Sequence, residues 1–173
     1  MDRFYYPFAG AYVRSYLART DLKKEDPGIK DDKNLVQWGV KTAKIRELHR
    51  FKKTDLGTLP RVQFILGVLK GVQPNVIIDF GSQRGALLWP MMDLMSETQF
   101  WAVDFDPEVA KFLNRVVSGG IDRLHVLEQP VETLGDRFED GAAEVVVVSE
   151  FLEHLPDPLP ALKEAFRLAN QMV

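Results

Sequence analysis

Short apolar runs alternate with helix-forming segments from about residue 76 to the end of the sequence. Four such runs are VIIDF (76–80), FWAVDF (100–105), LHVL (124–127) and EVVVVS (144–149). A strand that is apolar throughout is typical of a parallel sheet covered on both faces. Alternation of strands with helices predicts an α/β fold with right-handed crossovers. We therefore expect a doubly wound, mostly parallel sheet, incomplete in that about four strands are visible.

The segment before these runs is expected to be helical. FYYPFAGAYVRSYLAR (4–19) predicts a short helix interrupted near Pro7 and Gly10, and a polar loop follows at 21–34. Apolar residues at helical spacing predict another helix over 35–51. Pro60 suits the start of a further helix, which ends near Gly71. We predict an N-terminal helical cap over 1–59 and a sheet domain over 60–173.

Composition restricts the classes of function. The chain has 173 residues and no cysteine, which fits one domain and excludes disulfides, thiolate metal sites and cysteine nucleophiles. Neither a membrane-spanning run nor a signal peptide is visible, so we expect a cytoplasmic protein. Residues 41–53 carry six basic side chains and one acid. Such a stretch could contact phosphates, but we expect a solvated helix face.

The first predicted strand runs into a glycine loop, IIDFGSQRGALL. In open α/β sheets, ligands bind beyond the carboxyl ends of the strands. Asp79 precedes Gly81 and is placed to face a cationic group, while glycine allows a tight turn and close ligand approach. Asp104 ends the second strand, where a carboxylate can accept hydrogen bonds from both hydroxyls of a ribose. The spacing D-x-G-x-x-x-G disfavours a dinucleotide oxidoreductase, because G-x-G-x-x-G would need glycine at Gln83.

Three segments taken in order, DFGSQRG (79–85), VDFDP (103–107) and VVVVSEFLEHLPDP (145–158), resemble the class I S-adenosylmethionine-dependent methyltransferases. The resemblance covers about residues 60–171 and implies a Rossmann-like fold. It implies that S-adenosylmethionine is the cofactor and S-adenosylhomocysteine the product. The residues that would bind this cofactor are Asp79, Gly81, Ser82, Gln83, Gly85, Asp104, Phe105 and Val131.

The resemblance gives these positions individual roles. The loop residues would line the methionine end of the cofactor, Asp104 would take the ribose hydroxyls, and Phe105 would lie beside the adenine. The family usually has a second glycine where this chain has Gln83. Pro130 stands where the family often has an acid near the adenine amine, which leaves the Val131 backbone N–H or a shifted Glu128 for that contact.

Glu150, Glu153 and His154 follow the fourth strand as E-x-x-E-H. A helical turn that began at Ser149 would place all three on one face. His154 could act as a general base with a carboxylate orienting it, the three could hold a divalent cation, or the segment could be a structural turn. We predict catalytic or substrate-side roles for His154, Glu150 and Glu153, and no metal site.

E-x-x-E-H occurs in the ubiquinone-pathway O-methyltransferases and in the metal-dependent small-RNA 2′-O-methyltransferases. The LPDP that follows the histidine resembles the first group more. The second group uses a further histidine from beyond the fifth strand, and this chain has only His49 and His125 besides His154. A divalent metal therefore stays a secondary alternative.

The resemblance implies methyl transfer to an oxygen or nitrogen nucleophile of an acceptor, with a small molecule preferred over nucleic acid and no membrane partner. The family's later strands do not follow here, so the domain is expected to be truncated at its C-terminal side. A second copy of the chain or a partner segment could complete the sheet. The alternative function is a non-catalytic Rossmann-like module that binds S-adenosylmethionine or serves as a scaffold.

Overall fold

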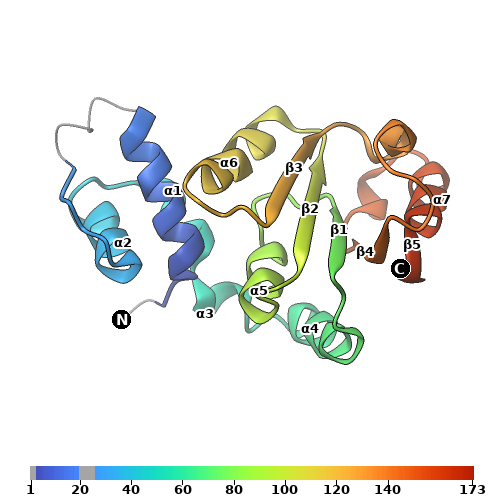
Figure 1. The fold of residues 1–173 in the computed structure, drawn as a ribbon, viewed down its shortest axis with the longest axis horizontal. Coiled ribbons are helices and arrows are strands. Elements are labelled where there is room, and N and C mark those ends of the chain that lie inside the picture. Colours follow the sequence, from blue (N-terminus) through green and yellow to red (C-terminus); the bar gives the residue numbers. More distant parts are fainter. Residues whose placement is uncertain (1–2, 20–25) are drawn as a thin grey trace.

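The computed structural model describes residues 3–19 and 26–173 (Figure 1). The helices are α1 Tyr6–Arg19, α2 Asp32–Lys41, η2 Arg46–Phe51, α3 Lys53–Leu56, α4 Pro60–Val72, α5 Leu88–Leu94, α6 Pro107–Ser118, η3 Val131–Asp136, η4 Leu152–His154 and α7 Leu159–Leu168, with η marking 3-10 helices. The strands are β1 Val76–Phe80, β2 Gln99–Asp104, β3 Leu124–Glu128, β4 Ala143–Val148 and β5 Ala169–Met172.

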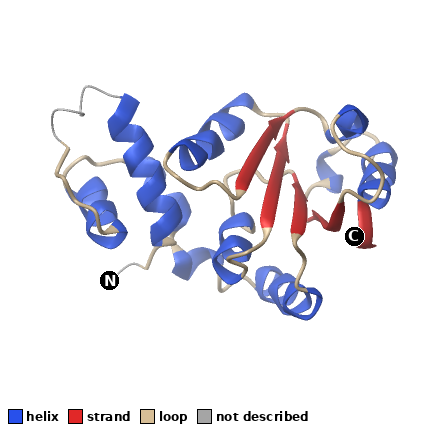
Figure 2. Ribbon diagram, in the orientation of Figure 1, coloured by secondary structure: helices blue, strands red, loops and turns tan. Residues whose placement is uncertain are grey.

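The strands form one parallel sheet in the order β3-β2-β1-β4-β5, flanked by helices (Figure 2). The predicted Rossmann-like α/β class is confirmed, with five strands where about four were visible in the sequence. From β1 the chain runs outward through β2 and β3, then returns to place β4 on the other side of β1. The carboxyl ends of β1 and β4 therefore form the switch point, where ligands bind in open α/β sheets.

Neighbouring residues of each central strand point into different cores. On β1, Ile77 belongs to the core formed with α4, α5 and α6, whereas Ile78 belongs to the core formed with η3 and α7. Val145 and Val146 divide in the same way on β4. Both faces are covered, so each strand is apolar throughout, as its sequence predicts.

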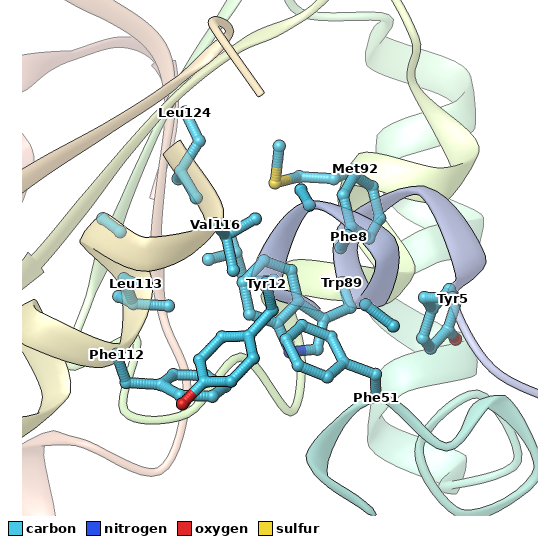
Figure 3. Close-up of a cluster of buried hydrophobic side chains, with 14 of the residues drawn as sticks. Tyr5, Phe8, Tyr12, Phe51, Trp89, Met92, Phe112, Leu113, Val116 and Leu124 are labelled. Carbon is cyan, nitrogen blue, oxygen red and sulfur yellow. The ribbon is translucent and has the colours of Figure 1, made fainter. Parts of the chain in front are cut away.

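The N-terminal helices share the first of these cores. An aromatic cluster joins Tyr12 of α1, Phe51 of η2, Trp89 of α5 and Phe112 of α6, with ring centroids 5.1–6.3 Å apart (Figure 3). The end of α6 lies so close to α1 that a Cβ on Gly119 would sit 1.9 Å from a backbone oxygen of α1. The cap is thus packed onto the sheet domain, and the predicted division at residue 59 remains a prediction.

Two predicted helices differ from the structure. The helix predicted over 35–51 is broken after α2, because the chain turns at Lys44, whose φ is +53°, before η2 begins. The helix α1 is continuous, because Pro7 lies in its first turn, where its missing N–H leaves no hydrogen bond unmade. The loop predicted at 21–34 falls partly outside the described residues, at 21–25.

None of the helices in the described ranges combines the length and the apolar character that crossing a bilayer requires.

Candidate active site

The glycine loop and the segment after β4 meet at the switch point of the sheet. Phe80 and Val148 are register partners at the ends of β1 and β4, so the residues that follow them lie side by side. They enclose a pocket of about 60 Å³. Its lining includes five residues predicted from the sequence, Asp79, Gly81, Ser82, Gln83 and Glu150.

Both glycines of the loop occupy positions that no other residue fits. Gly81 has φ +67° and Gly85 has φ +84°, in the left-handed region. A Cβ on Gly81 would lie 2.4 Å from the ring of Phe151, and one on Gly85 would lie 2.1 Å from the indole of Trp89. The loop is therefore clamped between two aromatic side chains, one from α5 and one from the segment after β4.

Gln83 has a left-handed backbone conformation of the kind that favours glycine. Its φ is +47°, and its side chain is exposed. Its backbone N–H donates a hydrogen bond of 2.9 Å to Oδ2 of Asp104. The loop thus turns as a glycine would allow, at a cost in backbone strain of the order of 1 kcal/mol.

The carboxylate of Asp104 is oriented by two backbone N–H groups and keeps acceptor positions for a ligand. Its buried carboxylate accepts the Gln83 N–H on Oδ2 and the Asp106 N–H on Oδ1, the latter at 3.0 Å. Each carboxylate oxygen has two lone pairs, so each retains one acceptor position. This geometry fits the predicted ribose contact. The neighbouring Phe105 is 65% exposed and free to lie against a flat ligand.

Asp79 is a buried carboxyl at the bottom of the pocket, 3% exposed. Burial raises its pKa from 3.8 to about 7, a hydrogen bond with Ser82 opposes that rise, and the charge of Asp104 adds to it. The Ser82 hydroxyl also donates to the Asp79 backbone carbonyl at 2.9 Å. No cationic side chain of residues 3–19 or 26–173 pairs with Asp79, so the carboxyl fits the ammonium group of an amino-acid-type ligand.

Val131 begins η3, where its backbone N–H has no acceptor within the helix. Its side chain is buried, so only the main chain is available to a ligand. Glu128 ends β3 as the register partner of Asp104 and is exposed. The structure therefore keeps both predicted options for an adenine contact open.

The acidic-histidine segment does not form the single helical face that a turn starting at Ser149 would give. Glu150 has φ +51°, and the 3-10 helix begins only at Leu152. Glu150 consequently lines the pocket, while Glu153 and His154 are exposed on η4 beyond it. Within residues 3–19 and 26–173, no group of three or more histidine and acidic side chains is arranged to hold a metal ion.

Arg61 is a pocket residue that the sequence analysis missed. It lies in the first turn of α4 and is the only cationic side chain among the residues that line this pocket. Its Nη2 lies 3.0 Å from Oε2 of Glu150, with side chains 40% and 54% exposed. Nothing local in the sequence pointed to Arg61, because the contact joins residues that are far apart in the chain.

Comparison with solved structures gives the same fold. A protein of Methanococcus maripaludis assigned to the S-adenosyl-L-methionine-dependent methyltransferases aligns with a TM-score of 0.54 and 22% identity over 63% of this chain. The methyltransferase domain of bacterial CtHen1 aligns at 0.53 and 22% over 65% of this chain. The methyltransferase PaMTH1 of Podospora anserina, solved with S-adenosylhomocysteine, aligns at 0.53 and 15% over 73% of this chain.

The chain spans 49% of the Methanococcus structure, 62% of the CtHen1 domain and 57% of PaMTH1. No curated protein matches the sequence. A family model described as a methyltransferase domain matches residues 78–171, more than half of the 173 residues. This match contains the glycine loop, Asp104 and the E-x-x-E-H segment, and confirms the predicted class I S-adenosylmethionine-dependent methyltransferase family. The chain belongs to the methyltransferase-domain family.

Proposed function

We propose that this chain binds S-adenosylmethionine at the switch point and transfers its methyl group to an oxygen or nitrogen nucleophile of a small-molecule acceptor. The observation that carries the proposal is the hydrogen bond from the Gln83 N–H to Asp104, because it joins the glycine loop to the acid at the end of β2. Both parts of the sequence were predicted to bind one ligand.

The side chains match the chemistry of this cofactor. Asp79, buried and without a cationic partner in the described chain, suits its ammonium group. Arg61 lines the same pocket and suits its carboxylate, once it is released from Glu150. The spare acceptor positions of Asp104 suit the ribose hydroxyls. Glycine at 81 and 85 gives the loop between them its shape.

When bound, S-adenosylmethionine supplies a methyl group on a positively charged sulfur that a nucleophile can displace. Positioning of the two reactants accounts for most of the rate in such a reaction. His154 is the candidate general base that takes the proton from the acceptor, and Glu150 and Glu153 are the candidate acceptor contacts. Glu150 lines the pocket, whereas η4 presents Glu153 and His154 to the solvent beside it.

The alternative is a Rossmann-like module that binds the cofactor without catalysis or serves as a scaffold. The observation that favours it is the size of the pocket, about 60 Å³, with Arg61 and Glu150 paired at its lining. Pockets for ligands of this size usually measure about 300–1,000 Å³. Under our proposal, separation of this exposed ion pair opens the site, which costs less than about 1 kcal/mol for the pair itself.

Isothermal titration of the protein with S-adenosylmethionine and S-adenosylhomocysteine tests the proposal. We expect both to bind, and the Asp104→Asn variant to bind at least about tenfold more weakly, since it loses a hydrogen-bonded charge. Asp122→Asn, at an exposed acid before β3, is the matched control. If neither compound binds the wild-type protein, the cofactor site is refuted. Binding without methyl transfer to any acceptor would favour the alternative.

The cytoplasmic location and the sheet-completing partner remain predictions. The same holds for the choice between the two E-x-x-E-H groups.

A further inference from the structure

A second pocket lies on the other side of the glycine loop, between η2, the loop and α6. It measures about 260 Å³ and is mostly polar at its surface. Its charged residues are Arg50, Arg84, Lys111 and Arg115, with Glu47 and Glu108. Four cations and two carboxylates give it a net charge of +2. We call it the cationic pocket.

Two of its cations are already engaged. Lys111 lies 3.3 Å from a carboxylate oxygen of Glu108. Arg115 donates a hydrogen bond of 2.7 Å to the Tyr12 hydroxyl, and its guanidinium lies 5.5 Å from the centre of that ring. Tyr12 and Phe112 form the aromatic wall of the pocket and lie at one end of the buried cluster (Figure 3). Arg115 is thus part of a rigid wall.

The other two cations have no anionic partner. Within residues 3–19 and 26–173, no carboxylate lies at ion-pair distance from the guanidinium of Arg50 or Arg84. Arg50 stacks over the Phe112 ring at 4.9 Å, and its Nε is buried without a hydrogen-bond acceptor. Burial lowers the pKa of Arg50, and the nearby charge of Arg84 lowers it further. The charge of Glu47, which also lines the pocket, raises the pKa of Arg50 and so offsets part of this effect. Two guanidinium groups therefore line one pocket without a carboxylate at ion-pair distance.

An anion placed between Arg50 and Arg84 would remove both unfavourable features. It would neutralise the repulsion between the two charges and supply acceptors to their N–H groups. The planar guanidinium group binds phosphate in a bidentate manner, which makes arginine the preferred residue for phosphate recognition. The net charge of +2 matches a phosphate monoester near its fully ionised state.

We propose that the cationic pocket binds the phosphate group of a small phosphorylated molecule. The volume of about 260 Å³ holds a phosphate with a few further atoms. The stretch 41–53 contributes Glu47 and Arg50 to this site, and its other five basic residues lie outside the pocket lining. This site does not depend on methyl transfer, although Arg84 belongs to the loop that carries Gln83.

Titration with inorganic phosphate, with a nucleoside monophosphate and with the matching nucleoside tests the proposal. Affinity is measured by calorimetry, and thermal unfolding is followed in parallel. We expect both phosphates to bind and to raise the melting temperature progressively as their concentration exceeds the Kd, and the nucleoside to have no effect. Arg84→Gln should weaken phosphate binding about tenfold or more. Arg46→Gln, at an exposed arginine of the same 3-10 helix as Arg50, should leave the affinity unchanged.

Arg84→Gln has a further expected effect that a purely structural role would not produce. It removes a like charge beside Arg50, so the phosphate-free variant should be at least as thermostable as the wild type. Failure of both phosphates to bind would overturn the proposal. So would an affinity that falls equally in the Arg84→Gln and Arg46→Gln variants. A third titration, with single-stranded oligonucleotides, tests for binding of a polyanion. Oligonucleotide binding that strengthens with length and depends equally on Arg84 and Arg46 would mean a diffuse basic surface and not this pocket.

Discussion

The ring of Trp89 lies against Gly85, and its Nε1 donates a hydrogen bond of 3.0 Å to the backbone carbonyl of Arg84. One buried side chain of α5 thereby supports the whole turn of the glycine loop. The loop lies between two pockets, with Ser82 and Gln83 in the lining of one and Arg84 in the lining of the other.

Gly85→Ala should destabilise the protein by about 2–4 kcal/mol, since the added Cβ combines a positive φ with a clash against Trp89. The free energy of unfolding in urea measures this. Gly67→Ala is the control, because nothing lies within 4 Å of its Cβ in α4. There, alanine should stabilise the helix by about 0.5–1 kcal/mol. Equal effects at the two positions would contradict the clamped loop.

Gln83→Gly should leave stability within about 1 kcal/mol of the wild type, because relief of strain at φ +47° is offset by the added freedom of the unfolded chain. Gln83→Val should lose about 1–2 kcal/mol, since a branched side chain disfavours that conformation. Urea unfolding compares the two. Gln63→Val on the exposed face of α4 should cost only a few tenths of a kcal/mol. A valine variant as stable as the glycine variant would show that residue 83 is not held in the left-handed region.

Asp79 should make stability fall as the pH rises from about 4 to about 7. Burial raises its pKa in the folded protein from 3.8 to about 7, so across this window the unfolded chain loses a proton that the folded chain retains. At 1.36 kcal/mol per pKa unit, the loss amounts to at most about 4 kcal/mol. Asp79→Asn should remove this dependence and stabilise the protein at pH 8.

The comparison of Asp79 uses urea unfolding at pH 5 and pH 8 for the wild type, Asp79→Asn and the exposed Asp122→Asn. The last variant should keep the wild-type dependence on pH. Bound S-adenosylmethionine should reduce the dependence in the wild type, because a cation beside Asp79 favours its charged form. An unchanged slope in the Asp79→Asn variant would exclude this carboxyl as its source.

Glu150→Gln should barely change the unfolding free energy, because an exposed ion pair contributes less than about 1 kcal/mol. If the pair closes the pocket, its loss should strengthen S-adenosylmethionine binding by up to about fivefold. Calorimetry gives the affinity, with Glu139→Gln as the exposed control. Weaker binding in Glu150→Gln would mean that Glu150 itself contacts the cofactor.

Local patterns predicted the elements that build the site. The bounds of β1 and the position of Pro60 at the start of α4 follow from neighbouring residues alone, and the structure agrees with both. Asp79 and Gln83 were placed at the pocket because both belong to one strand and its turn.

Contacts between distant segments could not be predicted in this way. The pair of Arg61 and Glu150 depends on how α4 packs beside β4, and the cationic pocket depends on where η2 meets the loop. The break between α2 and η2 was not predicted, because the apolar residues of segment 35–51 keep roughly helical spacing through the turn. Periodicity reports which residues become buried, and it is a poor guide to the path of the backbone between them.

The aromatic cluster shared by Tyr12, Phe51 and Trp89 affects how cooperatively the protein unfolds. Removing residues 1–59 would expose the faces of α5 and α6 that now lie under these rings. We therefore expect that the boundary near residue 59 does not separate two cooperative units. Cap and sheet should melt in one transition, and amides of α1 and β1 should become accessible to hydrogen exchange at the same free energy.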